Sequence, residues 1–313
     1  MKKLRLALLS GGTSSEREVS LASGMEVAAA LDPSRYEILR FDPATDLEAL
    51  VRESPGLDVA FPALHGHRGE DGALQGMLAM LGVPCVGSGV LASALAMDKR
   101  MSKDIYRLRG LPVAADDFAE RGGAGARAEA ARISGGLGLP AVVKPLDHGS
   151  SVGMALARTP GELESALEGA WKHSPVAMAE RYLAGREYTV AVLGNGNPAA
   201  LPPIEIVPGP GHPFFDYGAK YLEGECREIV PCDLGPAEDR EIRRLALLAH
   251  AALGCRGLSR TDFILSGGTF HLLETNTLPG LTPQSLLPKA ARAHGLSFAE
   301  LLDILVDLAL EPA

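Results

Sequence analysis

The sequence has little cysteine and no long apolar segment. Its four cysteines form no C-x-x-C pair and follow no regular spacing, which favours reduced thiols in the cytoplasm over a disulfide framework. They are Cys85, Cys226, Cys232 and Cys255. The opening MKKLRLALLSGG places basic residues before an apolar run, as a secretory signal does, but the run is short and ends in Gly-Gly. It therefore predicts a buried first strand, and no segment predicts a membrane helix.

Positive charge is also scarce. Thirty Lys and Arg against 39 Asp and Glu give a formal net charge of −9, and the pI is near 5.4. This balance argues against nucleic acid as the main partner, because nucleic-acid binding needs a basic surface. The apolar fraction of 46% and the charged fraction of 22% are typical of a globular protein. A length of 313 residues then predicts two or three domains.

Three nucleotide-binding and hydrolase signatures are absent. The Gly-rich turn at 10–15 lacks the G-x-G-x-x-G spacing, which disfavours a nicotinamide enzyme. The Gly/Ser loop at 145–153 follows its lysine, whereas a Walker loop places the lysine after the glycines. Ser150 could serve as a nucleophile, but no G-x-S-x-G elbow surrounds it, so a hydrolase triad is disfavoured.

The first hundred residues alternate between short apolar runs and helical patterns. Strands are predicted at 4–9, 36–41, 59–62 and 84–86, and helices at 16–31, 46–52 and 72–81. This alternation indicates an α/β domain with a mainly parallel sheet. Ser15 and Glu18 form a capping-box pattern, which places Glu16 in the first helical turn. Glu16 either stabilises this helix or binds a cationic group of a ligand at the carboxyl end of the sheet, and taken alone it favours the first.

Two histidines follow the third strand. His65 and His67 lie two residues apart, but a third ligand is missing, so a ligand-facing loop is favoured over zinc. The segment 90–109 then predicts one long, increasingly basic helix, on which Lys99 would ordinarily be solvated. The segment 120–131 is rich in small residues and predicts a surface connection.

The middle of the chain contains a lysine at a strand end. Residues 139–144 are apolar and end in Lys144, ahead of the Gly/Ser loop, which suits a phosphate group held by an ammonium and by backbone N–H groups. Glu180 ends another apolar strand and Glu187 lies near the start of the next, where carboxylates suit an adenosine unless they are ordinary exposed acids. Residues 208–224 have the length and polarity of a lid.

The stretch 260–276 brings acids, an amide and a base together. A Ser-Gly-Gly turn at 266–268 separates two strand patterns, so a hairpin would place Asp262 beside Glu274. Asn276 lies two residues after Glu274 and points to the same face. Two carboxylates and an amide oxygen suit Mg²⁺ bound together with substrate phosphates. Arg260 either stabilises an oxygen that gains negative charge or simply pairs with one of these acids.

These segments together resemble the D-alanine:D-alanine ligases of the ATP-grasp superfamily over nearly the whole chain. Six motifs carry the resemblance in the family's order: GGTSSEREVSL (11–21), ALHGHRGEDGALQGML (63–78), GSGVLASALAMDK (87–99), VVKPLDHGSSVGM (142–154), DYGAKYL (216–222) and RTDFILSGGTFHLLETNTLPGLTPQSL (260–286). The resemblance implies a mixed α/β ATP-grasp fold, with a parallel α/β domain at 1–97 followed by two α+β subdomains at 98–184 and 185–313.

The resemblance also implies a role for each matching residue. ATP would be bound by Lys99, Lys144, Glu180, Glu187 and Lys220. Two Mg²⁺ or Mn²⁺ ions would be held by Asp262, Glu274 and Asn276. Catalysis would involve Glu16, Ser150, Tyr221, Arg260 and Ser285. The two substrates would contact Glu16, His65, Gly280, Ser285 and Leu286.

The implied reaction is ATP-dependent joining of two D-alanine molecules through a D-alanyl phosphate, for peptidoglycan precursor synthesis. The implied protein is a cytoplasmic homodimer that associates through its N-terminal domain. Three alternatives remain open at this point: a D-alanine:D-lactate ligase, another ATP-grasp carboxylate-amine ligase, and a nucleotide-binding regulatory module without turnover. Tyr221 beside Lys220 resembles the dipeptide-forming ligases.

Overall fold

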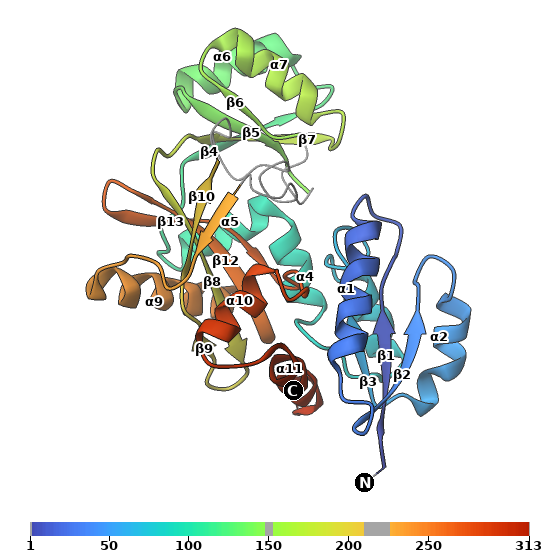
Figure 1. The fold of residues 1–313 in the computed structure, drawn as a ribbon. Helices are drawn as coiled ribbons and strands as arrows, with labels where there is room; N and C mark the ends of the chain where they lie inside the picture. Colours follow the sequence, from blue (N-terminus) through green and yellow to red (C-terminus); the bar gives the residue numbers. More distant parts are fainter. Residues whose placement is uncertain (1, 148–152, 210–225, 313) are drawn as a thin grey trace.

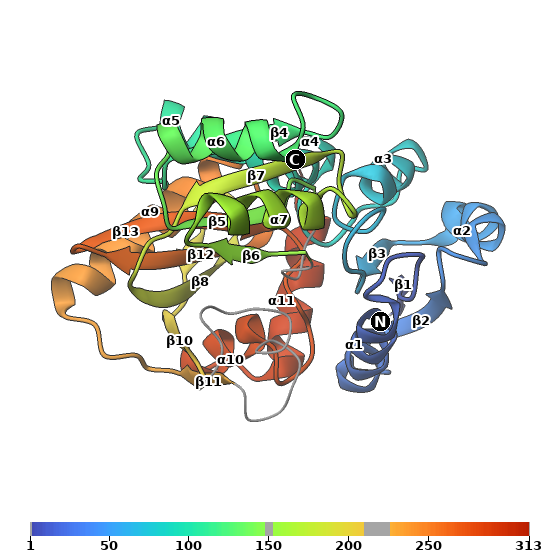
Figure 2. The ribbon, with the colours of Figure 1, turned by 90° about the horizontal axis from the view of Figure 1, so that it is seen from above.

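The computed structural model describes residues 2–147, 153–209 and 226–312. Three sheets succeed one another along the chain, and helices cover them in a mixed α/β arrangement (Figure 1). The second sheet stands above the third in Figure 1 and overlies it in the view of Figure 2, while the first sheet lies to one side in both views. No helix in the described ranges combines the length and apolar composition needed to cross a membrane.

The first sheet is parallel, as predicted, with strand order β2-β1-β3. Its elements are β1 (Leu4–Leu9), α1 (Arg17–Ala30), β2 (Tyr36–Phe41), α2 (Leu47–Glu53), η1 (Ser54–Gly56), β3 (Val59–Pro62) and α3 (Ala73–Met80). The predicted strand at 84–86 is reduced to a single bridge between Ala60 and Cys85. The predicted capping box is wrong, because Glu16 is the N-cap residue of α1 and makes no side-chain capping bond. Glu16 therefore lies just outside the helix.

The helix predicted at 90–109 is two helices, α4 (Val90–Met97) and α5 (Lys99–Leu108). Asp98 separates them with extended backbone angles, and its carboxylate accepts bonds from the N–H groups of Arg100 and Met101. A carboxylate in this position satisfies the free donors of the first turn, so it begins a new helix rather than continuing the old one. The break redirects α5, and Lys99 and Lys103 are buried rather than solvated.

The second sheet is antiparallel and has the strand order β4-β7-β5-β6. Its strands are β4 (Asp116–Glu120), β5 (Ala141–Pro145), β6 (Ala155–Ala157) and β7 (Val176–Arg181), and its helices are α6 (Ala126–Gly136) and α7 (Pro160–Ala170). The segment 120–131, predicted as a connection, forms the end of β4, a short turn and the start of α6. Ala130 is buried, and with Ile133 of the same helix it belongs to a core shared with α7 and the strands.

The third sheet contains the path β11-β10-β8-β12-β13, with β9 paired to β8. Its strands are β8 (Arg186–Gly194), β9 (Ala199–Ala200), β10 (Ile204–Pro208), β11 (Cys226–Ile229), β12 (Gly257–Ser266) and β13 (Thr269–Asn276). Helix α9 (Pro236–Leu253) packs on this sheet through an apolar stripe that includes Ile242 and Leu245. Helix α5 joins the same core through Tyr106.

The chain ends in α10 (Leu286–Ala293) and α11 (Phe298–Leu310). Both helices contribute to a core that also contains Leu6 and Leu8 of β1, so the C-terminal residues hold the first sheet against the third. In Figure 1, α11 lies beside the blue N-terminal part. This packing places the loops at the carboxyl ends of β1 and β3 opposite the β12–β13 hairpin.

Candidate active site

The β12–β13 hairpin forms with the acids adjacent, as the sequence predicted. Asp262 is the register partner of Glu274, and Arg260 is the partner of Asn276. The register shifts between Asp262 and Phe263, so the bulge lies directly beside the acids. The bulge changes the direction of the strand at the point where the polar residues face the cavity.

The Asp262 side chain is buried and accepts several hydrogen bonds. The Arg260 guanidinium donates to both of its oxygens, at 3.0 and 3.1 Å, and the Thr189 hydroxyl donates to Oδ1 at 2.5 Å. Burial disfavours the charged form of Arg260, but Asp262 outweighs it and the pKa of Arg260 is raised. The Asn276 amide nitrogen lies 3.5 Å from Asp262 Oδ2. The arginine therefore stays charged beside the acids.

A cavity of about 570 Å³ opens over this hairpin and collects most of the predicted substrate and catalytic residues. Its lining includes Glu16, His65, Arg260, Glu274, Asn276, Gly280, Ser285 and Leu286. They come from the carboxyl ends of β1 and β3, from the hairpin, and from the loop before α10. Segments more than two hundred residues apart thus form one polar cavity.

His65 lies between two charges in this cavity. Burial lowers the pKa of His65, Arg260 lowers it further, and Glu16 opposes both. Its Nε2 is buried and has no hydrogen-bond partner within the described residues. Because buried ring nitrogens are ordinarily satisfied, an unpaired one facing a cavity suits a ligand hydrogen bond.

The loop before α10 is tightly built. The Ser285 hydroxyl lies 2.8 Å from the Thr282 hydroxyl and accepts from the Thr282 N–H at 3.1 Å. A Cβ at Gly280 would stand 2.9 Å from Ser285 Oγ, so only glycine fits beside the serine. The loop therefore presents backbone N–H groups and hydroxyls to the cavity in a fixed arrangement.

The predicted ATP residues divide between two sheets. Lys144 on β5 donates to Glu180 Oε2 on β7 at 2.9 Å. Lys99 on α5 lies 3.7 Å from Glu274 Oε2, which links this part of the site to the hairpin acids. Glu187 lies on β8 of the third sheet, where its register partners are Ile206 and Ile264. Ser150, Lys220, Tyr221 and most of the predicted lid lie outside the described residues.

Two profiles of known families match the chain. One, described as the D-ala D-ala ligase C-terminus, matches residues 105–307, and the other, described as the D-ala D-ala ligase N-terminus, matches residues 44–88. The D-alanine–D-alanine ligase of Syntrophobacter fumaroxidans is 49% identical over 310 residues, which are 99% of each chain. That of Moorella thermoacetica is 46% identical over 314 residues, which are 99% of this chain and 100% of the relative.

This chain belongs to the D-alanine–D-alanine ligase family. A crystal structure of the Bacillus anthracis D-alanine–D-alanine ligase complexed with ATP superimposes with a TM-score of 0.84 at 33% identity and covers 98% of this chain and 97% of the other. The VanG D-Ala:D-Ser ligase of Enterococcus faecalis gives 0.85 at 29% identity, with 98% and 100% covered. The mixed α/β ATP-grasp fold expected from the sequence is confirmed.

The donor chemistry of the hairpin fits a hard divalent cation. Two carboxylates and one amide supply oxygens, and Asp262 is close to the Asn276 amide, whose oxygen and nitrogen exchange places on a half-turn. The described ranges contain no cluster of three or more His, Cys, Asp and Glu. The zinc alternative at His65 and His67 therefore has no third ligand there, and the remaining ligands of a cation in this ligase would be phosphates and water.

Three residues that the sequence analysis did not single out lie at or near the candidate site. Glu70 and Glu228 line the cavity. Burial raises the pKa of Glu70 to about 8, while its Oε2 accepts from the Gly66 N–H at 2.6 Å. Lys103 lies beside Glu180 in the interior. Glu70 could have been found in the GED run after the histidines, but Lys103 gave no signal among the basic residues of α5.

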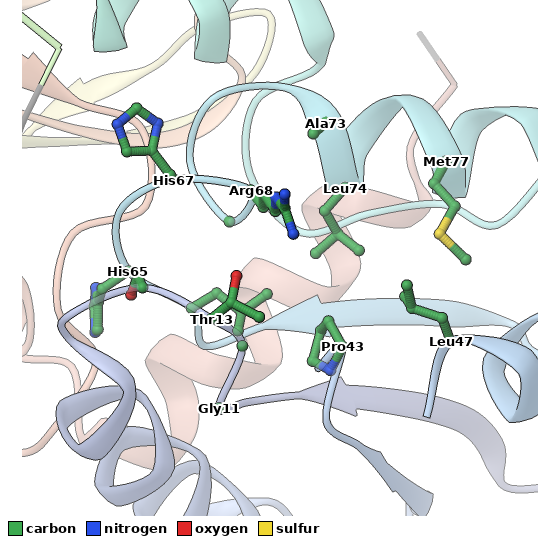
Figure 3. Close-up of a pocket in the computed structure, with 14 residues that line it drawn as sticks. Gly11, Thr13, Pro43, Leu47, His65, His67, Arg68, Ala73, Leu74 and Met77 are labelled. Atoms are coloured by element: carbon green, nitrogen blue, oxygen red, sulfur yellow. The ribbon is translucent and has the colours of Figure 1, made fainter. Parts of the chain in front are cut away.

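A second, smaller cavity of about 220 Å³ shares His65 with the first (Figure 3). Its walls are mainly apolar and include Pro43, Leu47, Leu74 and Met77. Figure 3 shows His65 at one end of this space, away from Leu47 and Met77 at the other. Apart from His65 it collects none of the predicted site residues.

Proposed function

We propose that the chain joins two molecules of D-alanine into D-alanyl-D-alanine at the expense of ATP, and so supplies peptidoglycan precursor synthesis in the cytoplasm. The observation that carries the proposal is the single polar cavity in which the β1 and β3 loops face the β12–β13 hairpin. The membership of the chain in the ligase family supports the same reaction.

In the first step, a carboxylate oxygen of one D-alanine attacks the γ-phosphorus of ATP, and the bond to ADP breaks. The product is D-alanyl phosphate. Glu16 binds the ammonium of this D-alanine. The Nε2 atom of the neutral His65 ring forms one hydrogen bond with the same D-alanine molecule. Lys99 and Lys144 offset phosphate charge. When bound, Mg²⁺ or Mn²⁺ held by Asp262, Glu274 and Asn276 polarises the phosphate oxygens.

In the second step, the amine of the other D-alanine attacks the acyl carbon. The carbonyl oxygen becomes an oxyanion. The attacking nitrogen then gives one proton to the departing phosphate and keeps one as the amide N–H, while the bond between the acyl carbon and the phosphate oxygen breaks. Arg260 and the Gly280 N–H stabilise the oxyanion, because both are fixed before the reaction begins. Ser285 and Leu286 at the start of α10 anchor the carboxylate of this second substrate.

The remaining assignments complete this proposal. Glu180 and Glu187 bind the adenosine, Ser150 and Tyr221 form a hydrogen-bonded network over the site, and Lys220 reaches the transferring phosphoryl group. The first 97 residues form the first-substrate domain, 98–184 the central subdomain, and 185–313 the metal and second-substrate subdomain. Exclusion of water by the 208–224 lid protects the acylphosphate.

The proposed homodimer has a candidate surface on the N-terminal domain. Met80 on α3 is 92% exposed, and Leu91 on α4 is also exposed. Exposed apolar side chains that gather in one patch mark an association surface, and these two residues are the candidates for such a patch. Sedimentation equilibrium of the chain and of the pair Met80→Lys and Leu91→Lys tests this, with a monomer expected for the double variant and an unchanged mass contradicting it.

The experiment that tests the function measures phosphate release and identifies the product by mass spectrometry. With ATP, Mg²⁺ and D-alanine we expect stoichiometric phosphate and D-alanyl-D-alanine. D-Lactate is expected not to compete with D-alanine near neutral pH, and D-serine serves as a second acceptor because a structural neighbour is a D-Ala:D-Ser ligase. Equal yields of dipeptide and depsipeptide, or ATP binding without turnover for any acceptor, would defeat the proposal.

A further inference from the structure

The inference concerns a buried group of charges at the base of the proposed ATP site. Glu180 on β7 is buried, and its two oxygens are shared between two lysines. Lys103 donates to Oε1, and Lys144 donates to Oε2 at 2.9 Å. Lys103 Nζ also lies 4.0 Å from Asp116 Oδ2. One carboxylate is therefore in contact with two lysine side chains at the same time. Burial and the neighbouring Lys144 lower the pKa of Lys103, and Asp116 opposes both.

The strand register explains why Lys103 is needed. Glu180 and Asp116 are register partners on neighbouring antiparallel strands, so two acids face each other in the interior. Like charges directly opposite each other destabilise a sheet. Lys103 projects from α5 between the two carboxylates, while Arg107, one turn later, pairs with Asp116.

The two lysines differ in their freedom to move. The Lys103 side chain is 0% exposed and is fixed within the packing of α5. The Lys144 side chain is 12% exposed and comes from the end of β5, next to the Gly/Ser loop. Only Lys144 is therefore placed to leave Glu180 for a ligand. When it does so, the buried carboxylate keeps Lys103 as its counter-ion.

We propose that Lys103 is a positioning residue that holds the charge of Glu180 in place while Lys144 turns from Glu180 to a phosphate of the nucleotide. This role rests on the proposed function, because it assumes that ATP binds beside Lys144. Without Lys103, ATP would have to separate the last ion pair of a buried carboxylate. An uncompensated buried charge is strongly unfavourable, so that separation would weaken ATP binding.

The test is a double-mutant cycle on ATP affinity, measured by calorimetry with MgATP and the full chain. Lys103→Met should weaken ATP binding by about 10-fold or more in the wild-type background. In the Glu180→Gln background, where no carboxylate is left without a partner, the same substitution should change the affinity by less than about 3-fold. Lys103→Arg should retain most of the wild-type affinity, because it retains the charge.

Arg107→Gln is the matched control, since it removes a cation one turn away that pairs with Asp116 and not with Glu180. Its ATP affinity should equal that of the wild type. A merely structural role for Lys103 would lower the melting temperature and weaken ATP equally in both backgrounds, and that result would overturn the inference. If Lys103→Met does not fold, Lys103→Gln and the double variant still close the cycle.

Failure of the proposed function would give a different result. If the wild-type chain bound MgATP but made no dipeptide, the proposed ligase reaction would be contradicted. The double-mutant cycle could still be measured, because it depends only on ATP affinity. Wild-type chain that makes dipeptide, with ATP affinity indifferent to Lys103, would contradict only the role of Lys103. The apparent KM for D-alanine should stay within about 2-fold of wild type in Lys103→Met, because the substituted side chain lies outside the substrate cavity.

Discussion

Two pairs of acids face each other across antiparallel strands in this chain, and they are neutralised differently. Asp262 and Glu274 are paired across β12 and β13 at the edge of the cavity. Asp116 and Glu180 are paired across β4 and β7 in the interior. The interior pair is surrounded by three cations, Lys103, Lys144 and Arg107. A buried pair of acids needs compensation from the chain itself, because water cannot supply it.

The cavity pair also has cations nearby among the residues that the structure describes. Arg260 occupies Asp262, and Lys99 lies 3.7 Å from Glu274. Helix α5 serves both pairs, since Lys99 and Lys103 are one turn apart on the same face. One helix therefore contacts both acid pairs. We expect the cavity pair to be the open pair, which binds a divalent cation, whereas the interior pair is closed by lysines of the chain itself.

The largest expected effect distinguishes the two pairs directly. Glu274→Gln should lower the rate of dipeptide formation about 100-fold, roughly 3 kcal/mol, and should raise the Mg²⁺ concentration needed for half-maximal rate. Glu180→Gln should leave the Mg²⁺ requirement unchanged. Initial rates across a Mg²⁺ titration measure both. If the two variants shift the Mg²⁺ requirement equally, the division into an open and a closed pair is wrong.

A third acid sharpens the comparison, because Glu70 lines the same cavity as Glu274 and makes no ion pair within the described part of the chain. Burial raises its pKa from 4.5 to about 8. The folded chain therefore binds a proton that the unfolded chain releases between these values, so Glu70 lowers the stability progressively as pH rises from about 4.5 to 8.

Glu70→Gln should remove that pH dependence. Urea unfolding at pH 5 and pH 8 should show a smaller loss of stability for the variant than for the wild type. Glu300→Gln, on the exposed face of α11, is the control, because the hydrogen bonds of Glu300 with Ser297 lower its pKa, whereas the pKa of Glu70 is raised. A variant whose stability falls with pH as steeply as the wild type's would show that Glu70 titrates normally.

The sequence could predict the open pair but not the closed one. The Ser-Gly-Gly turn and the strand patterns on both sides of it predicted that Asp262 would lie beside Glu274, and the structure confirms this. Such pairing depends on the local geometry of the chain, which the residues of the turn determine. The turn residues do not predict the bulge, in which Leu273 of β13 is an extra residue between the partners of Asp262 and Phe263.

The closed pair depends on tertiary contacts. Lys103 was one of several basic residues in a segment predicted as a single helix, and β4 was not predicted at all. Only the break at Asp98 and the placement of β4 beside β7 bring Lys103 to Glu180. Asp98 ahead of a helical pattern is an N-cap signal that could have revealed the break. The burial of Lys103 has no equivalent signal.

Helix α5 must be fixed to the hairpin if it is to serve both acid pairs. The Tyr106 hydroxyl, which is buried, donates to Thr275 Oγ1 at 2.7 Å, and Thr275 lies 2.9 Å from the Thr261 hydroxyl. Tyr106→Phe should therefore cost about 1 kcal/mol of unfolding free energy. Denaturant unfolding measures this. A stability equal to that of the wild type would show that apolar packing alone fixes α5.

The smallest expected effect belongs to the outermost cation of the closed pair. The Arg107 side chain is 37% exposed, and it pairs with both Asp104 and Asp116. Because water screens an exposed guanidinium, Arg107→Gln should lower the unfolding free energy by less than about 1 kcal/mol, and the loss should shrink further in 1 M salt. Lys103→Met should cost more and respond less to salt, since its charge is buried. If Arg107→Gln and Lys103→Met lowered the unfolding free energy by the same amount and with the same salt dependence, Asp116 rather than Glu180 would be the acid that both cations compensate.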